Sequence, residues 1–101
     1  PAAPASALKN GAYLGNYAND FFGAIAIVEK DGALAIVEGP KKLTFPLKHY
    51  DRDTFTYDTI GENAVGRTGV TFTIGPDGQA AQVIVENLNV RGEGTFKRVV
   101  R

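Results

Sequence analysis

The chain has 101 residues, of which 44% are hydrophobic, so it is long enough for one domain with one core. It contains no cysteine, which excludes a disulfide, and a core of this size needs none. Its eleven basic and eleven acidic side chains cancel, and we therefore expect neither nucleic acid nor an anionic membrane surface as its main partner. Methionine is absent, even at position 1, which predicts a fragment or a processed product.

The first ten residues predict a linker or disordered tail, and residues 11–101 predict a single barrel domain. Small residues and prolines fill the opening Pro1-Ala2-Ala3-Pro4-Ala5-Ser6-Ala7. This stretch is too short and too polar for a signal or membrane-spanning segment. We therefore expect further sequence upstream.

Short runs of β-forming residues fill the rest of the chain, with turn signals between them. In residues 43–48, 54–57 and 70–74, large apolar residues alternate with Thr, Lys or Pro. Successive side chains of a strand point to opposite faces, so this alternation predicts strands with one buried face. The predicted strands are 12–18, 23–29, 33–38, 43–49, 54–58, 69–75, 79–88 and 94–100, and helix is nearly excluded.

The turns between these runs are short. Asp31-Gly32 and Asp77-Gly78 predict tight hairpins, Gly39-Pro40 predicts a further turn, and residues 60–69 form the longest predicted loop. Such short links force neighbouring strands to pair antiparallel. The predicted fold is therefore all-β, an eight-stranded antiparallel up-and-down barrel.

We expect this barrel to close by pairing its first strand with its last, because closure removes exposed edges. Pro46 has no N–H for a ladder and should mark a bulge or a local gap in the wall. The interior of so small a barrel should be filled by side chains. The expected core is Ile25, Ile27, Leu34, Ile36, Phe45, Leu47, Phe55, Tyr57, Phe72, Val83 and Val85.

Several short motifs, taken in order, carry a resemblance to a known family. They are Gly15-Asn16-Tyr17-Ala18-Asn19, Phe21-Phe22-Gly23, Leu43-Thr44-Phe45-Pro46-Leu47-Lys48-His49, Asp53-Thr54-Phe55, Val70-Thr71-Phe72, Asp77-Gly78 and Phe96-Lys97-Arg98. Over nearly all of residues 8–100 the chain resembles the lipocalin-like C-terminal domains of unknown function appended to class C β-lactamase-related serine hydrolases and peptidases. The resemblance implies a lipocalin-like barrel behind a catalytic domain, in a periplasmic or secreted bacterial setting.

The resemblance also suggests a barrel-closing pair. In lipocalin-like barrels a G-x-aromatic on the first strand commonly packs beneath a basic side chain of the last strand. Tyr17, after Gly15, and Arg98 match these positions. A guanidinium over a tyrosine ring contributes about 0.5–2 kcal/mol, whereas the alternative is that Arg98 is an ordinary exposed charge.

Three fragments imitate a serine β-lactamase site: Ser6-Ala7-Leu8-Lys9, Tyr17-Ala18-Asn19 and Arg67-Thr68-Gly69. Such a nucleophile must be held rigidly and activated by a base. Ser6, the only serine, lies instead in the predicted tail. We therefore expect no catalytic residue and no enzyme activity in this chain.

His49, the only histidine, is followed by Asp51 and Asp53, and this trio suggests a metal site or a general base. A turn held by aspartates, with His49 at the barrel rim, explains the same residues. We favour this structural role and expect neither a metal nor a cofactor. Glu38, beside Lys41 and Lys42, is expected to be a solvated turn charge.

Phe21, Phe22, His49 and Tyr50 are candidates for an interface or a barrel mouth. Two adjacent phenylalanines point to opposite faces of a strand, so one of them should leave the core. A large exposed aromatic is a favoured interface anchor.

Two function classes follow. The first is a non-catalytic accessory domain that packs on the upstream hydrolase domain or on a partner subunit, including a second copy of the chain, to gate substrate access or set assembly. The alternative is a lipocalin-like carrier of a small hydrophobic ligand in the barrel, which would require an open apolar pocket of about 300 Å³ or more.

Overall fold

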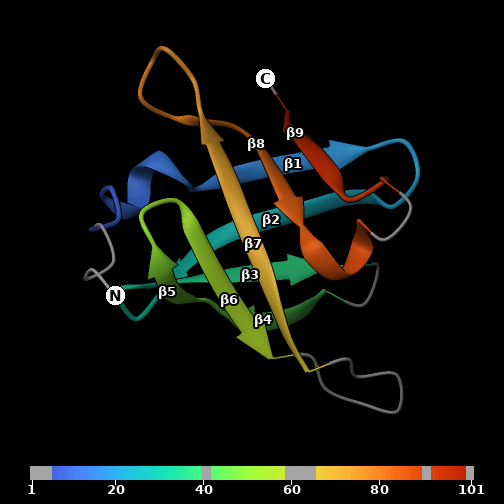
Figure 1. Ribbon diagram of the computed structural model, residues 1–101, viewed down its shortest axis with the longest axis horizontal. Helices are drawn as coiled ribbons and strands as arrows, with labels where there is room; N and C mark the ends of the chain where they lie inside the picture. Colours follow the sequence, from blue (N-terminus) through green and yellow to red (C-terminus); the bar gives the residue numbers. More distant parts are fainter. Residues whose placement is uncertain (1–5, 40–41, 59–65, 90–91, 100–101) are drawn as a thin grey trace.

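A computed structural model describes residues 6–39, 42–58, 66–89 and 92–99 (Figure 1). Within these residues it contains nine strands and two short 3₁₀ helices. They are η1 (Asn10–Ala12), β1 (Gly15–Asn19), β2 (Gly23–Lys30), β3 (Ala33–Glu38), β4 (Leu43–Pro46), β5 (Lys48–Asp51), β6 (Thr54–Asp58), β7 (Arg67–Ile74), β8 (Ala80–Val85), η2 (Glu86–Leu88) and β9 (Thr95–Arg98).

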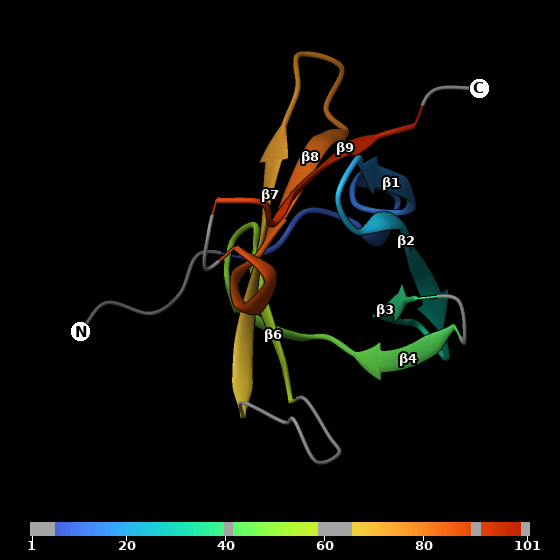
Figure 2. The same cartoon turned by 90° about the vertical axis from the view of Figure 1, so that its right-hand side faces the viewer.

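The strands form one sheet in the order β4-β3-β2-β1-β9-β8-β7-β6-β5, and every adjacent pair is antiparallel. β1 pairs with β9 through Tyr17 opposite Arg98 and Ala18 opposite Lys97. The first strand therefore meets the last, and the predicted all-β antiparallel barrel is confirmed. In Figure 2 the β6–β8 layer faces the β1–β4 layer, and β9 joins β1 at the top.

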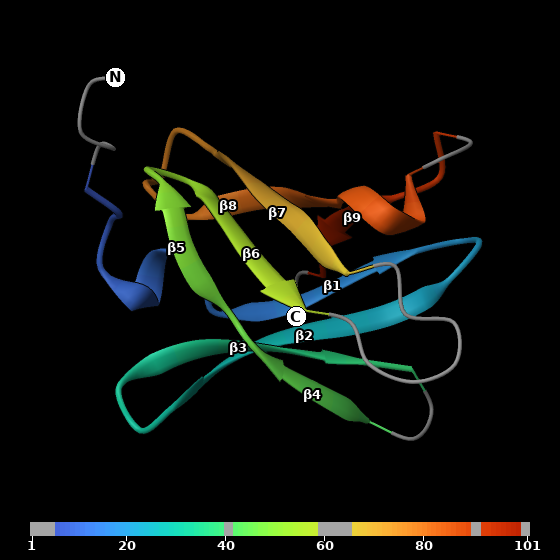
Figure 3. The same cartoon turned by 60° about the horizontal axis from the view of Figure 1, so that its bottom comes forward.

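The barrel wall is interrupted at Leu47, between β4 and β5. β4 pairs with β3 up to Ala35 opposite Pro46, whereas β5 pairs with β6 from Lys48 opposite Thr56. The single strand predicted over 43–49 is thus two strands, which gives nine instead of eight. The interruption lies beside Pro46, where the missing N–H predicted a gap, and Figure 3 shows the chain bending there.

Two predicted strand ends are 3₁₀ turns. The predicted strand 12–18 starts late, because the amide of Tyr13 bonds to the carbonyl of Asn10 in η1. The predicted strand 79–88 ends early at Val85, because the amide of Asn87 turns to the hydroxyl of Thr68. A local backbone bond at the first place and a bond to a distant side chain at the second therefore replace ladder pairing.

The predicted hairpins are confirmed. Asp31 and Gly32 have φ values of 54° and 82° between paired strands, and Gly78 has a φ of 83° after β7. The predicted loop 60–69 is shorter at its end, since β7 already begins at Arg67. Residues 59–65, Pro40 and Lys41 lie outside the described residues.

The core runs through the middle of the barrel. All eleven predicted core residues are at most 9% exposed, and five further side chains complete the cluster: Tyr13, Tyr17, Val70, Ala80 and Phe96. In the described part of the chain, no helix has the length and apolar character needed to cross a membrane.

Candidate functional site

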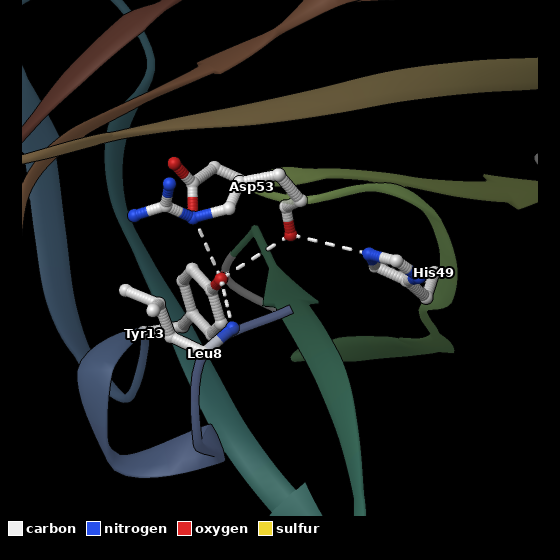
Figure 4. Close-up of polar contacts among 5 residues, drawn as sticks. Leu8, Tyr13, His49 and Asp53 are labelled. Carbon is white, nitrogen blue, oxygen red and sulfur yellow. Dashed lines mark hydrogen bonds and ion pairs between the residues drawn. The ribbon is translucent and has the colours of Figure 1, made fainter. Parts of the chain in front are cut away.

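Tyr13 fastens the N-terminal segment to the turn between β5 and β6 (Figure 4). Its hydroxyl donates to Asp53 Oδ1 (2.8 Å), lies 3.3 Å from the Arg52 carbonyl oxygen, and accepts a hydrogen bond from the amide of Leu8 (2.9 Å). His49 Nε2 lies 3.2 Å from the same Arg52 carbonyl. We call Leu8, Tyr13, His49, Arg52 and Asp53 the N-terminal clamp.

Burial dominates the electrostatics of the clamp. Tyr13 is fully buried, and its ring meets Phe55 and Phe72 at centroid distances of 5.2 and 4.8 Å. Burial raises the pKa of the Tyr13 hydroxyl, and the carboxylate of Asp53 raises it further. The hydroxyl therefore stays protonated and donates at physiological pH.

His49 has a structural position at the barrel rim. Its Nε2 must donate to the Arg52 carbonyl, since a carbonyl only accepts, and its ring packs edge-on against Phe55 at 5.3 Å. Among the residues that the structure describes, no three His, Cys, Asp or Glu side chains are grouped closely enough to hold a metal ion. Tyr50, the next residue, points away from the clamp onto the outer face of the barrel, where its side chain is 63% exposed.

The structure brings Tyr17 and Arg98 together. Arg98 Nη2 donates to the Tyr17 hydroxyl at 2.9 Å, and the guanidinium carbon lies 5.0 Å from the ring centroid. The Tyr17 hydroxyl in turn donates to the Tyr13 carbonyl at 2.7 Å. Hydrogen bonds therefore link β9 through β1 to the N-terminal clamp.

Phe21 and Phe22 lie together in the β1–β2 turn, at the end of the barrel opposite the clamp. Both are partly exposed, at 65% and 40%, and their rings contact each other at 4.7 Å. Both backbone amides donate to Asn19 Oδ1, and the Asn19 amide donates to the carbonyls of Glu93 and Thr95. The turn geometry, and not strand alternation, sets the direction of these two side chains.

Glu38 is not the solvated turn charge that the sequence predicts. It is partly buried at the end of β3 and accepts a hydrogen bond from the hydroxyl of Tyr57 at 2.8 Å. Burial raises the pKa of Glu38, and the Tyr57 hydrogen bond lowers it only in part. Burial and the nearby carboxylate also raise the pKa of Tyr57.

The three fragments that imitate a serine hydrolase site do not converge. Residues 6–9 lie at the clamp end, Tyr17 is buried with its hydroxyl between Arg98 and the Tyr13 carbonyl, and Arg67 pairs with Asp58 at the far end of β7. No nucleophile, base and third group are assembled from these fragments.

Sequence reasoning missed Tyr13 and Asn19 as organising residues. Asn19 stands directly before the three-residue turn Asp20-Phe21-Phe22. This place fits the preference of asparagine for bonding backbone amides two or three residues ahead, so a signal was present. Tyr13 precedes the first strand, and the acceptors of its hydroxyl, Arg52 and Asp53, lie about forty residues away, so no local pattern could identify it.

The model of a family described as a domain of unknown function, DUF3471, matches residues 1–98. Among solved structures, the chain is similar to the C-terminal domain of penicillin binding protein Rv0907, with a TM-score of 0.85 and 36% sequence identity, over 97% of this chain and 92% of that one. A comparison with curated proteins found no match. The family match spans nearly the whole barrel, and the chain therefore belongs to the DUF3471 family.

Proposed function

We propose that this barrel is a non-catalytic accessory domain of a serine hydrolase related to β-lactamases, and that it packs on the catalytic module or a partner subunit to gate substrate access or set assembly. The similarity to the C-terminal domain of a penicillin binding protein supports this proposal. The scattered positions of the serine-hydrolase fragments support contact, and not catalysis, as the task of the barrel.

The observation that carries the proposal is the N-terminal clamp. Leu8 is bonded to Tyr13, and the Asn10 side chain donates to Glu29 Oε2 (2.7 Å) and to the Gly32 carbonyl (3.0 Å). Two independent points therefore fix the direction of residues 8–10 against the barrel. This fixed direction supports an accessory role, because it sets the side of the barrel from which the chain arrives.

Two surfaces suit a contact with such a module. At the clamp end, His49 and Arg52 are exposed beside the incoming segment. At the opposite end, Phe21 and Phe22 form a braced aromatic pair. Large aromatics and arginine are the residue types that dominate contact energies at interfaces.

The carrier alternative has less support. Sixteen hydrophobic side chains, each at most 9% exposed, fill the described interior. The hollow of about 450 Å³ beside the β7–β8 hairpin is lined by Pro76, Asp77 and Arg98, among others, and it is open to solvent at the end of the barrel instead of enclosed in its interior. Its volume would suit a small ligand, but its place does not suit a barrel carrier.

The test uses the parent protein, whose sequence is read from the complete gene. Two samples are produced, the whole protein and a protein without residues 6–101. The proposal expects a serine hydrolase domain upstream. Removing the barrel should change kcat/KM for a bulky peptide or ester substrate at least tenfold more than for a small chromogenic ester, because gating acts through size.

A third sample, the barrel alone, should hydrolyse neither substrate. An upstream region without a hydrolase domain would refute the proposal, and so would equal effects of the deletion on both substrates together with an unchanged oligomeric state in light scattering. A signal peptide as the sole upstream element would favour the carrier.

A further inference from the structure

Gly69 is the third residue of β7 and lies opposite Thr56 of β6, and neither its backbone conformation nor its surroundings require a glycine. Its φ is outside the left-handed region, and an added Cβ would stand 3.6 Å from the nearest atom, Glu86 Oε1, at ordinary contact distance. Glycine weakens a strand interior. A strand glycine that the fold does not need often marks a place where a ligand approaches the backbone closely.

The missing side chain opens a groove on the outer face of the barrel. Two hollows of about 350 and 340 Å³ adjoin there, and both are lined by Thr54, Gly69 and Glu86. Tyr50 lines one of them and Asn89 the other. We call this surface, centred on Gly69 and running from Tyr50 to Asn89, the outer groove.

The groups along the outer groove are polar, aromatic and nearly neutral in sum. Thr54 Oγ1 and Thr71 Oγ1 lie 3.3 Å apart on its floor. The amide of Gly69 donates to Glu86 Oε1 at 3.1 Å, which holds the carboxylate in place before any ligand arrives. Arg67 also lines the groove, but it pairs with Asp58 at 3.8 Å, so the groove has no excess positive charge beside Glu86. The balance favours an uncharged ligand over a phosphate or another anion.

Tyr50 adds a flat, exposed aromatic wall to this polar surface. Its side chain is 63% exposed, and a tyrosine ring offers rigid apolar contact area at low entropic cost. A pyranose ring has the matching chemistry, since it has an apolar C–H face and a rim of hydroxyl groups that both donate and accept. Threonine hydroxyls, a fixed carboxylate and the Asn89 amide provide partners for that rim.

Backbone pairing argues against an extended peptide in the same place. β6, β7 and β8 form the floor of the groove and each pair with strands on both sides, so this floor offers no free strand edge for an added strand. We propose that the outer groove binds a neutral oligosaccharide, with Tyr50 stacking on a sugar ring above the space that Gly69 leaves open. This site does not depend on the upstream hydrolase.

The test is a titration of the 101-residue chain with cellotetraose, maltotetraose and chitotetraose, followed by amide NMR. At least one tetrasaccharide should shift the amides of Thr54, Gly69, Thr71 and Asn89. Tyr50→Ala and Gly69→Val should each weaken binding at least tenfold, the first by removing the wall and the second by filling the floor.

Phe21→Ala is the matched control, because Phe21 is 65% exposed at the end of the barrel opposite the clamp and lies outside the groove. It should bind like the parent chain. Spectra of each variant verify the fold, and if Gly69→Val does not fold, Tyr50→Ala alone decides.

Three results would overturn the proposal. They are the absence of shifts with all three sugars at about 10 mM, binding that survives Tyr50→Ala unchanged, and shifts of the same amides by a neutral Gly-Ser-Thr hexapeptide in place of the sugars. Each leaves the accessory role untouched, because that role is measured on the parent hydrolase.

Discussion

Arg98 brings a positive charge to the end of the barrel, where its donors reach neutral acceptors. Nε donates to the carbonyl of Ala80, Nη1 to the carbonyl of Leu14 (2.9 Å) and Nη2 to the hydroxyl of Tyr17. The fork of donors suits three fixed acceptors in a way that a lysine could not match. One side chain thereby joins β9 to β8, to β1 and to the residue before β1.

Gly15 is the residue that leaves room for this guanidinium. Its φ of 148° lies in a region that side chains rarely adopt, and a Cβ there would overlap Arg98 Nη1. We expect Gly15→Ala to lower the free energy of unfolding by about 2–3 kcal/mol, through backbone strain and displacement of Arg98. Urea unfolding measures the loss.

Gly11→Ala is the control for Gly15→Ala, because an added Cβ at Gly11 meets nothing within 4 Å and its φ is not positive. It should change stability by no more than about 0.5 kcal/mol. Equal stability of the Gly15→Ala variant and the parent would show that Arg98 does not need this space.

Glu38 should make stability depend on pH in an unusual direction. Its folded pKa is raised by burial above its ordinary value of 4.5, so the folded state holds the proton more tightly than the unfolded state. The stabilisation is complete below the unfolded pKa and is lost as pH rises through the folded pKa. Relative to the parent chain, Glu38→Gln should therefore gain stability between about pH 4 and pH 7.

Urea unfolding at both pH values tests this difference. Asp20→Asn, which changes an exposed carboxylate, is the comparison and should show no such gain. If Glu38→Gln instead lost stability relative to the parent as pH rose, the ionised carboxylate would be the stabilising form and the assigned direction would be wrong.

Among the secondary-structure elements, those set by a repeating pattern of neighbouring residues could be predicted from the sequence, and those set by particular contacts could not. Strands such as β6 and β7 are set by alternation, because one face is buried, and they appear where the pattern places them. η1 and η2 are fixed by individual hydrogen bonds, such as that of the Tyr13 amide with the Asn10 carbonyl and that of the Asn87 amide with Thr68, and strand propensity alone could not reveal them. The same holds for the clamp, in which Tyr13 meets Asp53 across 40 positions.

The β1–β2 turn depends on one asparagine. Asn19 accepts from the amides of Phe21 and Phe22 and donates to two carbonyls before and in β9. We expect Asn19→Ala to lower the free energy of unfolding by about 2 kcal/mol, since two partly buried carbonyls and two exposed turn amides lose their partner. Hydrogen exchange should accelerate at the amides of Phe21 and Phe22, while that of Val70 changes only with global stability.

Asn16→Ala is matched to Asn19→Ala, because Asn16 lies in the same strand and is exposed. It should leave both stability and exchange near the parent values. Faster exchange at Phe21 in both variants would mean that strand composition, and not the Asn19 side chain, holds the turn.

The barrel is closed by backbone pairing on one side and by side-chain packing on the other. β1 and β9 close one side by backbone pairing. This pairing was predictable, because without it the first and last strands would each leave an unpaired edge. On the other side β4 and β5 do not pair, and side chains fill the interruption, with Phe45 and Tyr57 at 5.1 Å. The proline predicted a gap, but no sequence pattern could show which rings would fill it.

A chain that ends at Glu93 should lose this architecture. Removing β9 takes away the fully buried Phe96 and all contacts of Arg98, and it exposes the edges of β1 and β8 together. Unpaired edges of this length are templates for association. We therefore expect the shortened chain to lose its cooperative thermal transition and to elute as aggregates in size-exclusion chromatography.

Removal of residues 100–101 alone is the control and should leave a monodisperse, cooperatively melting barrel, because Val99 still bonds to the Asn16 carbonyl at 2.8 Å. A shortened chain that stayed monomeric and cooperative would mean that the interior holds the fold without the pairing of first and last strand.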